Sequence, residues 1–163
     1  MNQKKISLFL SAADMLAALG ILFLAGIYAP AIAAESRFLY QDIPGIDALY
    51  WTGLAGVWSE SALFLLALFE YFRVCRRIGK NQSFCQENVK CLYHIAMFMA
   101  FGAFLWLCGI FVPSFLFSVS IGPVWIFLLL LAMANAALSI LAWGLGKLLN
   151  RAVEIKQEND LTV

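Results

Sequence analysis

Two acidic residues lie within long apolar stretches of this sequence. Asp14 interrupts the first stretch, and Glu60 lies inside the second. An ionisable side chain in hydrocarbon costs at least roughly 3 kcal/mol, so such residues usually face other helices, water or a ligand. Asn135 occurs in a later apolar stretch, at a similar depth when helical rise is counted, and Ser139 follows it on the same helical stripe. We therefore predict an intramembrane polar cluster formed by Asp14, Glu60, Asn135 and Ser139.

The predicted polar cluster has two interpretations. No lysine or arginine occurs at its depth, so Asp14 and Glu60 would share a proton or face a wet cavity or a bound cation. In that case the cluster responds to protons, cations or a ligand. Alternatively, a protonated carboxyl group hydrogen-bonded to Asn135 or Ser139 only holds the helices together. The residue types alone leave both interpretations open.

Other residues that could carry chemistry are sparse. The sequence has four cysteines, no Cys-x-x-Cys pair and a single histidine, His94. Cys85, Cys91 and His94, with Cys75, match no standard zinc-binding spacing. His94 itself fits either an interfacial aromatic residue with one hydrogen bond or a proton switch. We expect no catalytic residues, no bound metal, no cofactor and no enzymatic activity.

The elements that position these residues are membrane-spanning helices. Of the 163 residues, 63% are hydrophobic and 13% are charged, and the mean hydropathy is +0.85. A soluble domain has about half apolar and about a quarter charged residues, and a helix needs roughly 20 apolar residues to cross a bilayer. We predict an all-α fold, a four-transmembrane-helix bundle that forms one integral membrane domain over residues 1–163. The predicted spans cover about residues 6–28, 50–72, 91–112 and 123–146.

The basic residues lie on one side of the predicted spans. Every lysine and arginine except Arg37 precedes the first span, lies between the second and third, or follows the fourth. Positive charge of this kind favours the cytoplasmic side. We therefore predict cytoplasmic N- and C-termini, an outer loop at 29–49, a cytoplasmic loop at 73–90 and a cytoplasmic tail at 147–163. A net charge of +1 gives no basis for direct binding to nucleic acid.

The cytoplasmic loop contains signals that end one helix and start another. Gly79 suits the left-handed position that follows a helix. Ser83 followed by Gln86 forms a capping box that would start the next helix. Glu70, three residues before Arg73, predicts a surface ion pair.

The loop and the tail could also bind a partner protein. The tail begins as an amphipathic continuation of the fourth helix, and its helix propensity weakens near its end. Either the two segments only anchor the topology and contact lipid headgroups, or they form a docking surface. The candidate partner-binding residues are Arg76, Arg77, Lys80, Ser83, Phe84, Glu87 and Asn88 in the loop, and Glu158, Asn159 and Asp160 in the tail.

The same two segments carry a family resemblance. The loop reads Gly79-Lys-Asn-Gln-Ser-Phe-Cys-Gln-Glu-Asn88, and the chain ends Gln157-Glu-Asn-Asp-Leu-Thr-Val163. The loop resembles the signature loop, and the end resembles the acidic ending, of a bacterial inner-membrane family called domain of unknown function twenty-nine seventy-five. The resemblance implies a four-helix protein of the bacterial cytoplasmic (inner) membrane without an assigned activity. Such proteins are often encoded beside a small helix-turn-helix regulator of the Cro type, which implies that regulator as a partner by association only.

Three functions agree with these observations. We expect a non-enzymatic, membrane-embedded sensor or regulator, which could control a small cytoplasmic helix-turn-helix regulator. A second hypothesis is a small proton- or cation-linked transporter, or a channel-like oligomer, that uses Asp14 and Glu60. A third is a structural or immunity-type membrane protein whose polar residues only pack helices. Membrane lipids are expected partners in each case, and assembly into a homo-oligomer stays open.

Overall fold

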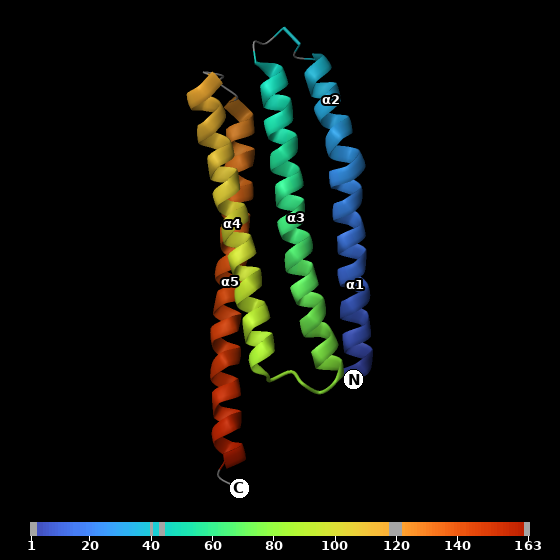
Figure 1. Cartoon of the computed structure of the whole chain (residues 1–163), viewed down its shortest axis with the longest axis vertical. Coiled ribbons are helices and arrows are strands. Elements are labelled where there is room, and N and C mark those ends of the chain that lie inside the picture. Colours follow the sequence, from blue (N-terminus) through green and yellow to red (C-terminus); the bar gives the residue numbers. More distant parts are fainter. Residues whose placement is uncertain (1–2, 40, 43–44, 118–121, 162–163) are drawn as a thin grey trace.

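The computed structural model describes residues 3–39, 41–42, 45–117 and 122–161, and its described elements are all helical (Figure 1). Helix α1 (Gln3–Phe23) continues through a π-helical turn, η1 (Leu24–Tyr28), into α2 (Ala29–Leu39). The remaining helices are α3 (Ile46–Gly79), α4 (Gln86–Phe117) and α5 (Gly122–Leu161). Four helical segments are long and apolar enough to cross a membrane, which confirms the predicted all-α fold with four spans.

The first span belongs to a longer helical rod than the sequence predicts. Residues 29–39 of the predicted outer loop are helical and continue the rod of the first span. The ring of Pro30 would normally clash with the carbonyl four residues earlier in a helix. Here Pro30 follows the wider η1 turn, where the Ala25 carbonyl accepts a hydrogen bond from Trp58 Nε1 at 3.0 Å. The π-helical turn therefore lets the helix continue past the proline.

Proline also fails to end α4. The third span is predicted to stop before Pro113, but α4 continues through this residue to Phe117. Membrane helices tolerate an internal proline because nearby groups can satisfy the backbone that the proline frees. In contrast, Pro123 is the second residue of α5, in the first turn, where a missing backbone N–H costs little.

The long helices pack against one another in chain order. Helix α1 lies against α3, α3 against α4, and α4 against α5; within the described residues, α1 contacts none of the long helices except α3. The side chains buried between them are mostly small, such as Ala96, Ala103 and Ala132. Small residues let helix backbones approach closely in a membrane. Large apolar side chains such as Phe9 and Ile140 point outward, 73% and 69% exposed, as expected for contact with lipid.

Both ends of the chain and the α3–α4 loop lie at the same end of the molecule (Figure 1), which we call the basic end. Gln86 Nε2 donates to Asn150 Oδ1 at 3.3 Å, so the start of α4 lies beside Asn150. From there α5 continues to Leu161, about 16 Å farther at the usual helical rise. The predicted helical continuation of the tail is thus confirmed, and α5 projects beyond the other helices (Figure 1).

The α3–α4 turn differs from its predicted form. Gly79 is the last residue of α3, and the left-handed conformation belongs instead to Asn81, with φ of 61°. Asparagine adopts this region more readily than most residues. Helix α4 begins at Gln86 and not directly after Ser83, so the predicted capping box is wrong. Gly79 instead allows α1 and α3 to approach closely, because a Cβ at this position would lie 2.7 Å from Ser7 Oγ on α1.

Candidate functional site

The carboxyl group of Glu60 is enclosed by three helices. Glu60 lies on α3 and is 7% exposed. The polar side chains that face it are Asn135 of α5 and Trp106 of α4. Gly102, one turn before Trp106, makes room for both neighbours: a Cβ there would lie 2.6 Å from Glu60 Oε2 and 3.1 Å from Asn135 Oδ1. We call Glu60, Trp106 and Asn135 the Glu60 triad.

The atoms of the Glu60 triad have unused hydrogen-bonding capacity. Both oxygens of Glu60, the indole Nε1 of Trp106 and Oδ1 of Asn135 are buried without a hydrogen-bond partner. The amide nitrogen of Asn135 is already engaged, since it donates to the Leu131 carbonyl at 3.1 Å. A carboxylic acid at Glu60 could donate to Asn135 Oδ1 while it accepts from Trp106 Nε1. The arrangement can therefore hold a proton on Glu60, or it can present oxygen atoms to a cation.

Asp14 does not join the triad. Its side chain is buried on α1, and its neighbours are Tyr71 and Cys75 of α3. The hydrogen bond from Ser7 Oγ to the Cys75 carbonyl, 2.7 Å long, sets the register of the two helices. Counted from this bond, Asp14 and Glu60 differ in height by eight residues, or about 12 Å. The predicted cluster of Asp14 with Glu60 is therefore wrong, because the two carboxyl groups are too far apart to share a proton.

Ser139 occupies a third place. Its hydroxyl group donates to the Ala96 carbonyl of α4 at 2.7 Å. This bond joins α4 to α5 one turn from Asn135, in the direction of the basic end. Ser139 therefore acts as a connection between helices. Of the four predicted cluster residues, only Glu60 and Asn135 lie together.

Sequence reasoning missed Trp106. The residues of the third span at the predicted depth of the cluster are Met99, Ala100, Phe101 and Gly102, and none of them has a polar side chain. The available signal was helical spacing: Trp106 is four residues after Gly102 and therefore lies on the same face of α4. Indole N–H groups are usually hydrogen-bonded when buried.

A second group of polar residues surrounds Glu70, near the basic end. Arg73 Nη1 lies 3.2 Å from Glu70 Oε2, which confirms the predicted ion pair. Glu70 is buried and Arg73 is exposed, so only the arginine of this pair lies at the surface. His94 Nδ1 of α4 lies 3.0 Å from Glu70 Oε1, so the histidine makes a hydrogen bond across two helices. This contact follows from the α3–α4 hairpin, which places residues equally distant from its turn opposite each other.

Asn88 holds the α3–α4 loop in place. Its side chain is completely buried, at 0% exposure. The amide nitrogen donates to the carbonyls of Gln82 and Ser83, at 3.1 and 2.9 Å. The amide oxygen accepts a hydrogen bond from Arg77 Nη1 at 3.2 Å. Arg77 Nη1 also donates to Cys91 Sγ at 3.3 Å. Asn88 is therefore unavailable to a partner, which corrects its assignment as a partner-binding residue, and Arg77 is largely engaged in the same network.

The other partner-binding candidates remain on the surface. Phe84 is 54% exposed, and Ser83 is half-buried. The side chain of Asp160 lies outside the described residues, although its backbone belongs to α5. The remaining candidates have exposed side chains: Arg76, Lys80, Glu87, Glu158 and Asn159. These residues are distributed over the loop and the projecting part of α5.

Comparison with known proteins assigns the chain to a family. A family model described as "Protein of unknown function (DUF2975)" matches residues 36–163. The chain belongs to this family. It is also similar to a Bacillus subtilis (strain 168) protein described as "Uncharacterized membrane protein YoaS", with 29% identity over 158 residues that cover 96% of this chain and 97% of the relative. No solved structure matches the chain. The family match includes the α3–α4 loop and the tail, which carry the resemblance, and it leaves out all of α1.

Proposed function

We propose that this protein is a non-enzymatic regulator of the bacterial cytoplasmic membrane whose basic end binds a cytoplasmic protein. The observation that carries the proposal is the projection of α5 about 16 Å beyond the start of α4. A membrane helix that ended at the bilayer surface would need no such extension. All lysines and arginines except Arg37 are at the basic end, which supports a cytoplasmic orientation for it.

The surface of the projecting helix supports contact with a protein. Val153 is buried against the rest of the molecule, and every described side chain from Glu154 to Asn159 is exposed. Ile155 is 59% exposed among charged neighbours, so it offers an apolar contact outside the predicted span. Exposed apolar residues rimmed by polar ones often mark protein–protein contacts.

The α3–α4 loop supplies a second, fixed part of this surface. The Gln86–Asn150 hydrogen bond joins the loop region to α5, and the bonds of Asn88 hold the loop backbone. Phe84 is therefore presented from a rigid segment next to α5. A rigid surface loses less entropy when a partner binds. The family resemblance suggests a small helix-turn-helix regulator as that partner.

Site-specific photo-crosslinking tests this proposal. A photoreactive residue is placed at Ile155 or at Phe84 in the full chain, in cells that also produce a small helix-turn-helix regulator of the Cro type. Phe38, at the opposite end of the first rod and equally apolar, is the control position. We expect adducts with the regulator from Ile155 and Phe84 and none from Phe38. Equal adducts from all three positions, or none from any, would contradict the proposal.

A truncated chain provides a second measurement. Removal of residues 154–163 spares the buried Val153 and takes away the exposed part of α5. We expect the truncated protein to insert normally and to lose the regulator from pull-downs. If transcription from the promoter that the regulator controls differs between the full and the truncated chain, then binding to this protein restrains the regulator. Retention of the regulator by the truncated chain would refute the role of α5.

The Glu60 triad supports a second candidate function, the handling of protons or cations. A buried carboxyl group without a hydrogen-bond partner is the kind of residue that marks proton and ion pathways in membranes. Flux of protons or monovalent cations into liposomes is the direct test, with Glu60→Gln as the variant and Asp14→Asn as the matched control. Flux that Glu60→Gln abolishes and Asp14→Asn leaves unchanged would favour transport over regulation.

A further inference from the structure

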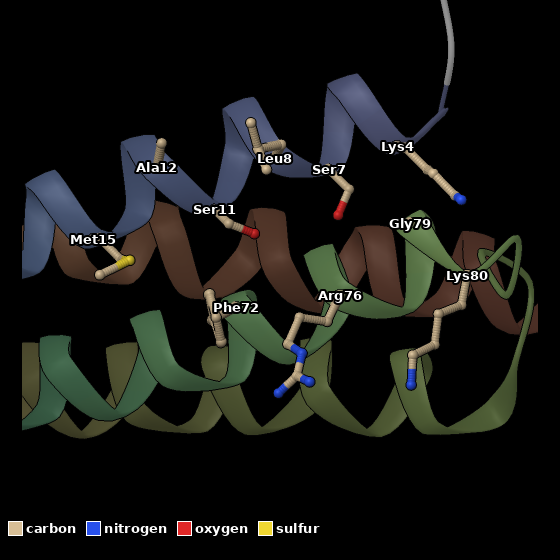
Figure 2. A pocket seen from close by; sticks show the side chains of 10 residues that line it. All are labelled: Lys4, Ser7, Leu8, Ser11, Ala12, Met15, Phe72, Arg76, Gly79 and Lys80. Atoms are coloured by element: carbon tan, nitrogen blue, oxygen red, sulfur yellow. The ribbon is translucent and has the colours of Figure 1, made fainter.

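A groove of about 560 Å³ runs between α1 and α3 at the basic end (Figure 2). The predicted first span begins near residue 6 and the predicted second span ends near residue 72, so the groove lies near the membrane boundary that the sequence predicts. The close contact between Ser7 and Gly79 joins the two helices at this end of the groove. Its position at the membrane boundary makes it accessible from the bilayer.

The polar end of the groove is positively charged. It is lined by Lys4 of α1, Arg76 of α3 and Lys80, which directly follows α3, and no acidic residue lines it. All three side chains are exposed. Two acids of these helices lie near the groove: Glu70 is engaged by Arg73 and His94, and Asp14 is buried beside Tyr71 and Cys75. The groove therefore offers three cationic groups to an anion.

The other end of the groove is apolar. Leu8 and Met15 of α1 and Phe72 of α3 line it, with the hydroxyl group of Ser11 between them, and Leu8 and Met15 are exposed. Figure 2 shows Met15 at the end of the groove farthest from Lys4. Eleven residues separate the two on α1, which corresponds to about 16 Å along the helix. An occupant must therefore combine an anionic head with an extended apolar part.

We propose that this groove binds an anionic phospholipid. The lipid phosphate lies among Lys4, Arg76 and Lys80, and one acyl chain follows Leu8, Met15 and Phe72. Basic pockets between membrane helices are suited to such headgroups. An acidic peptide would satisfy the three cations, but it would leave the apolar wall, which opens toward the bilayer, uncovered. The proposal does not depend on the regulatory function proposed above.

Lipid in this groove would also strengthen the attachment of α1. Within the described residues, α3 is the sole long helix that α1 contacts. A lipid that touches Lys4 and Leu8 on one side and Phe72 and Arg76 on the other adds a bridge between these two helices. Binding should therefore stabilise the folded protein as well as occupy the groove.

The test measures lipid binding to the full chain in detergent by native mass spectrometry. Phosphatidylglycerol is the probe, phosphatidylcholine is the zwitterionic comparison, and inorganic phosphate tests for a simple anion site. Lys4→Gln/Arg76→Gln/Lys80→Gln removes the three cations. Lys147→Gln/Arg151→Gln/Lys156→Gln removes the same charge from α5 and serves as the matched control. Circular dichroism establishes that each variant is folded.

We expect the groove variant to bind phosphatidylglycerol on the order of 100-fold more weakly, because each basic residue near an anionic lipid contributes about fivefold. The α5 variant should bind as the original chain does. Equal losses in both variants would overturn the proposal, as would equal affinity for phosphatidylcholine. Competition by inorganic phosphate at the concentration of the lipid would also overturn it, because the acyl chain would then contribute nothing.

A variant that leaves the charges intact provides an independent measurement. Ala12 lines the groove, and its side chain is exposed, so Ala12→Phe fills space in the groove without disturbing the buried contacts. We expect this variant to bind phosphatidylglycerol at least tenfold more weakly and to lose the increase in melting temperature that the lipid produces. Unchanged lipid binding by folded Ala12→Phe would place the lipid outside the groove.

Discussion

The carboxyl group of Glu60 packs so closely against the backbone of Gly102 that position 102 has no room for a Cβ atom. A Cβ at Gly102 would lie 2.6 Å from Glu60 Oε2. The glycine thus brings α4 near enough to α3 to enclose the carboxyl group, and Asn135 closes the third side from α5. The enclosure of Glu60 is therefore a property of the helix backbones as much as of the polar residues.

Gly102→Ala should destabilise the protein. The added methyl group would displace Glu60 and Asn135, at a cost of about 1–3 kcal/mol. Gly109→Ala, on the same helix, is the matched control, because a Cβ there meets nothing within 4 Å. The free energy of unfolding from SDS titration in mixed micelles is the measurement. Equal values for the two variants would show that the close approach is absent.

Glu60→Gln should leave stability within about 1 kcal/mol of the original or raise it. Glutamine has nearly the same volume, and it supplies a donor for Asn135 Oδ1 and an acceptor for Trp106 Nε1. Glu60→Leu takes away the carboxylic acid that could hydrogen-bond to both of these atoms, and it should cost about 1–3 kcal/mol. The same titration distinguishes them. If glutamine and leucine behave alike, the three residues of the triad make no hydrogen bonds with one another.

Gly79→Ala should loosen α1 from α3. Its Cβ would lie 2.7 Å from Ser7 Oγ and 2.9 Å from Ser7 Cβ, which predicts a cost of about 1–3 kcal/mol. Ser7→Gly removes both atoms, so the double variant should lose less stability than the sum of the single variants. A double-mutant cycle of unfolding free energies measures this coupling. Strict additivity would mean that the two residues do not meet.

Asn88→Ala should disrupt the α3–α4 loop. The substitution leaves the two loop carbonyls and Arg77 without their partner and creates a cavity, at a cost of about 2–4 kcal/mol. It should also make the loop more susceptible to proteolysis. Lys90→Ala, at an exposed position on α4, is the matched control and should change stability by no more than about 0.5 kcal/mol. Comparable proteolysis of the two variants would argue against the structural role of Asn88.

The sequence was sufficient to predict the four spans, because long apolar runs and the positions of the basic residues are visible in the order of residues along the chain. The ends of the helices were harder to predict. Proline normally breaks a helix, yet Pro30 and Pro113 both lie inside helices, and hydropathy does not encode the π-helical turn that accommodates Pro30. The helical continuation of the tail could be predicted because its apolar spacing keeps the helical period.

The candidate site could be predicted only in part. The proximity of Glu60 and Asn135 could be predicted because both residues lie at a similar depth when helical rise is counted from the same membrane surface. Asp14 was misplaced because its height depends on the register of α1 against α3, which the Ser7–Cys75 bond sets. Asn88 was assigned to a surface because asparagine is common in exposed loops, whereas here it is the residue that the loop folds around.

The pairing of α1 with α3 has a consequence for biosynthesis. The hydroxyl group of Ser7 bonds to a carbonyl that the ribosome adds 68 residues later. Helix α1 is therefore synthesised before α3 and has no contact with it until almost all of α3 has been made. During that interval Asp14 has none of its final neighbours, so the early nascent chain is the stage at which a membrane chaperone or a bound lipid would matter most.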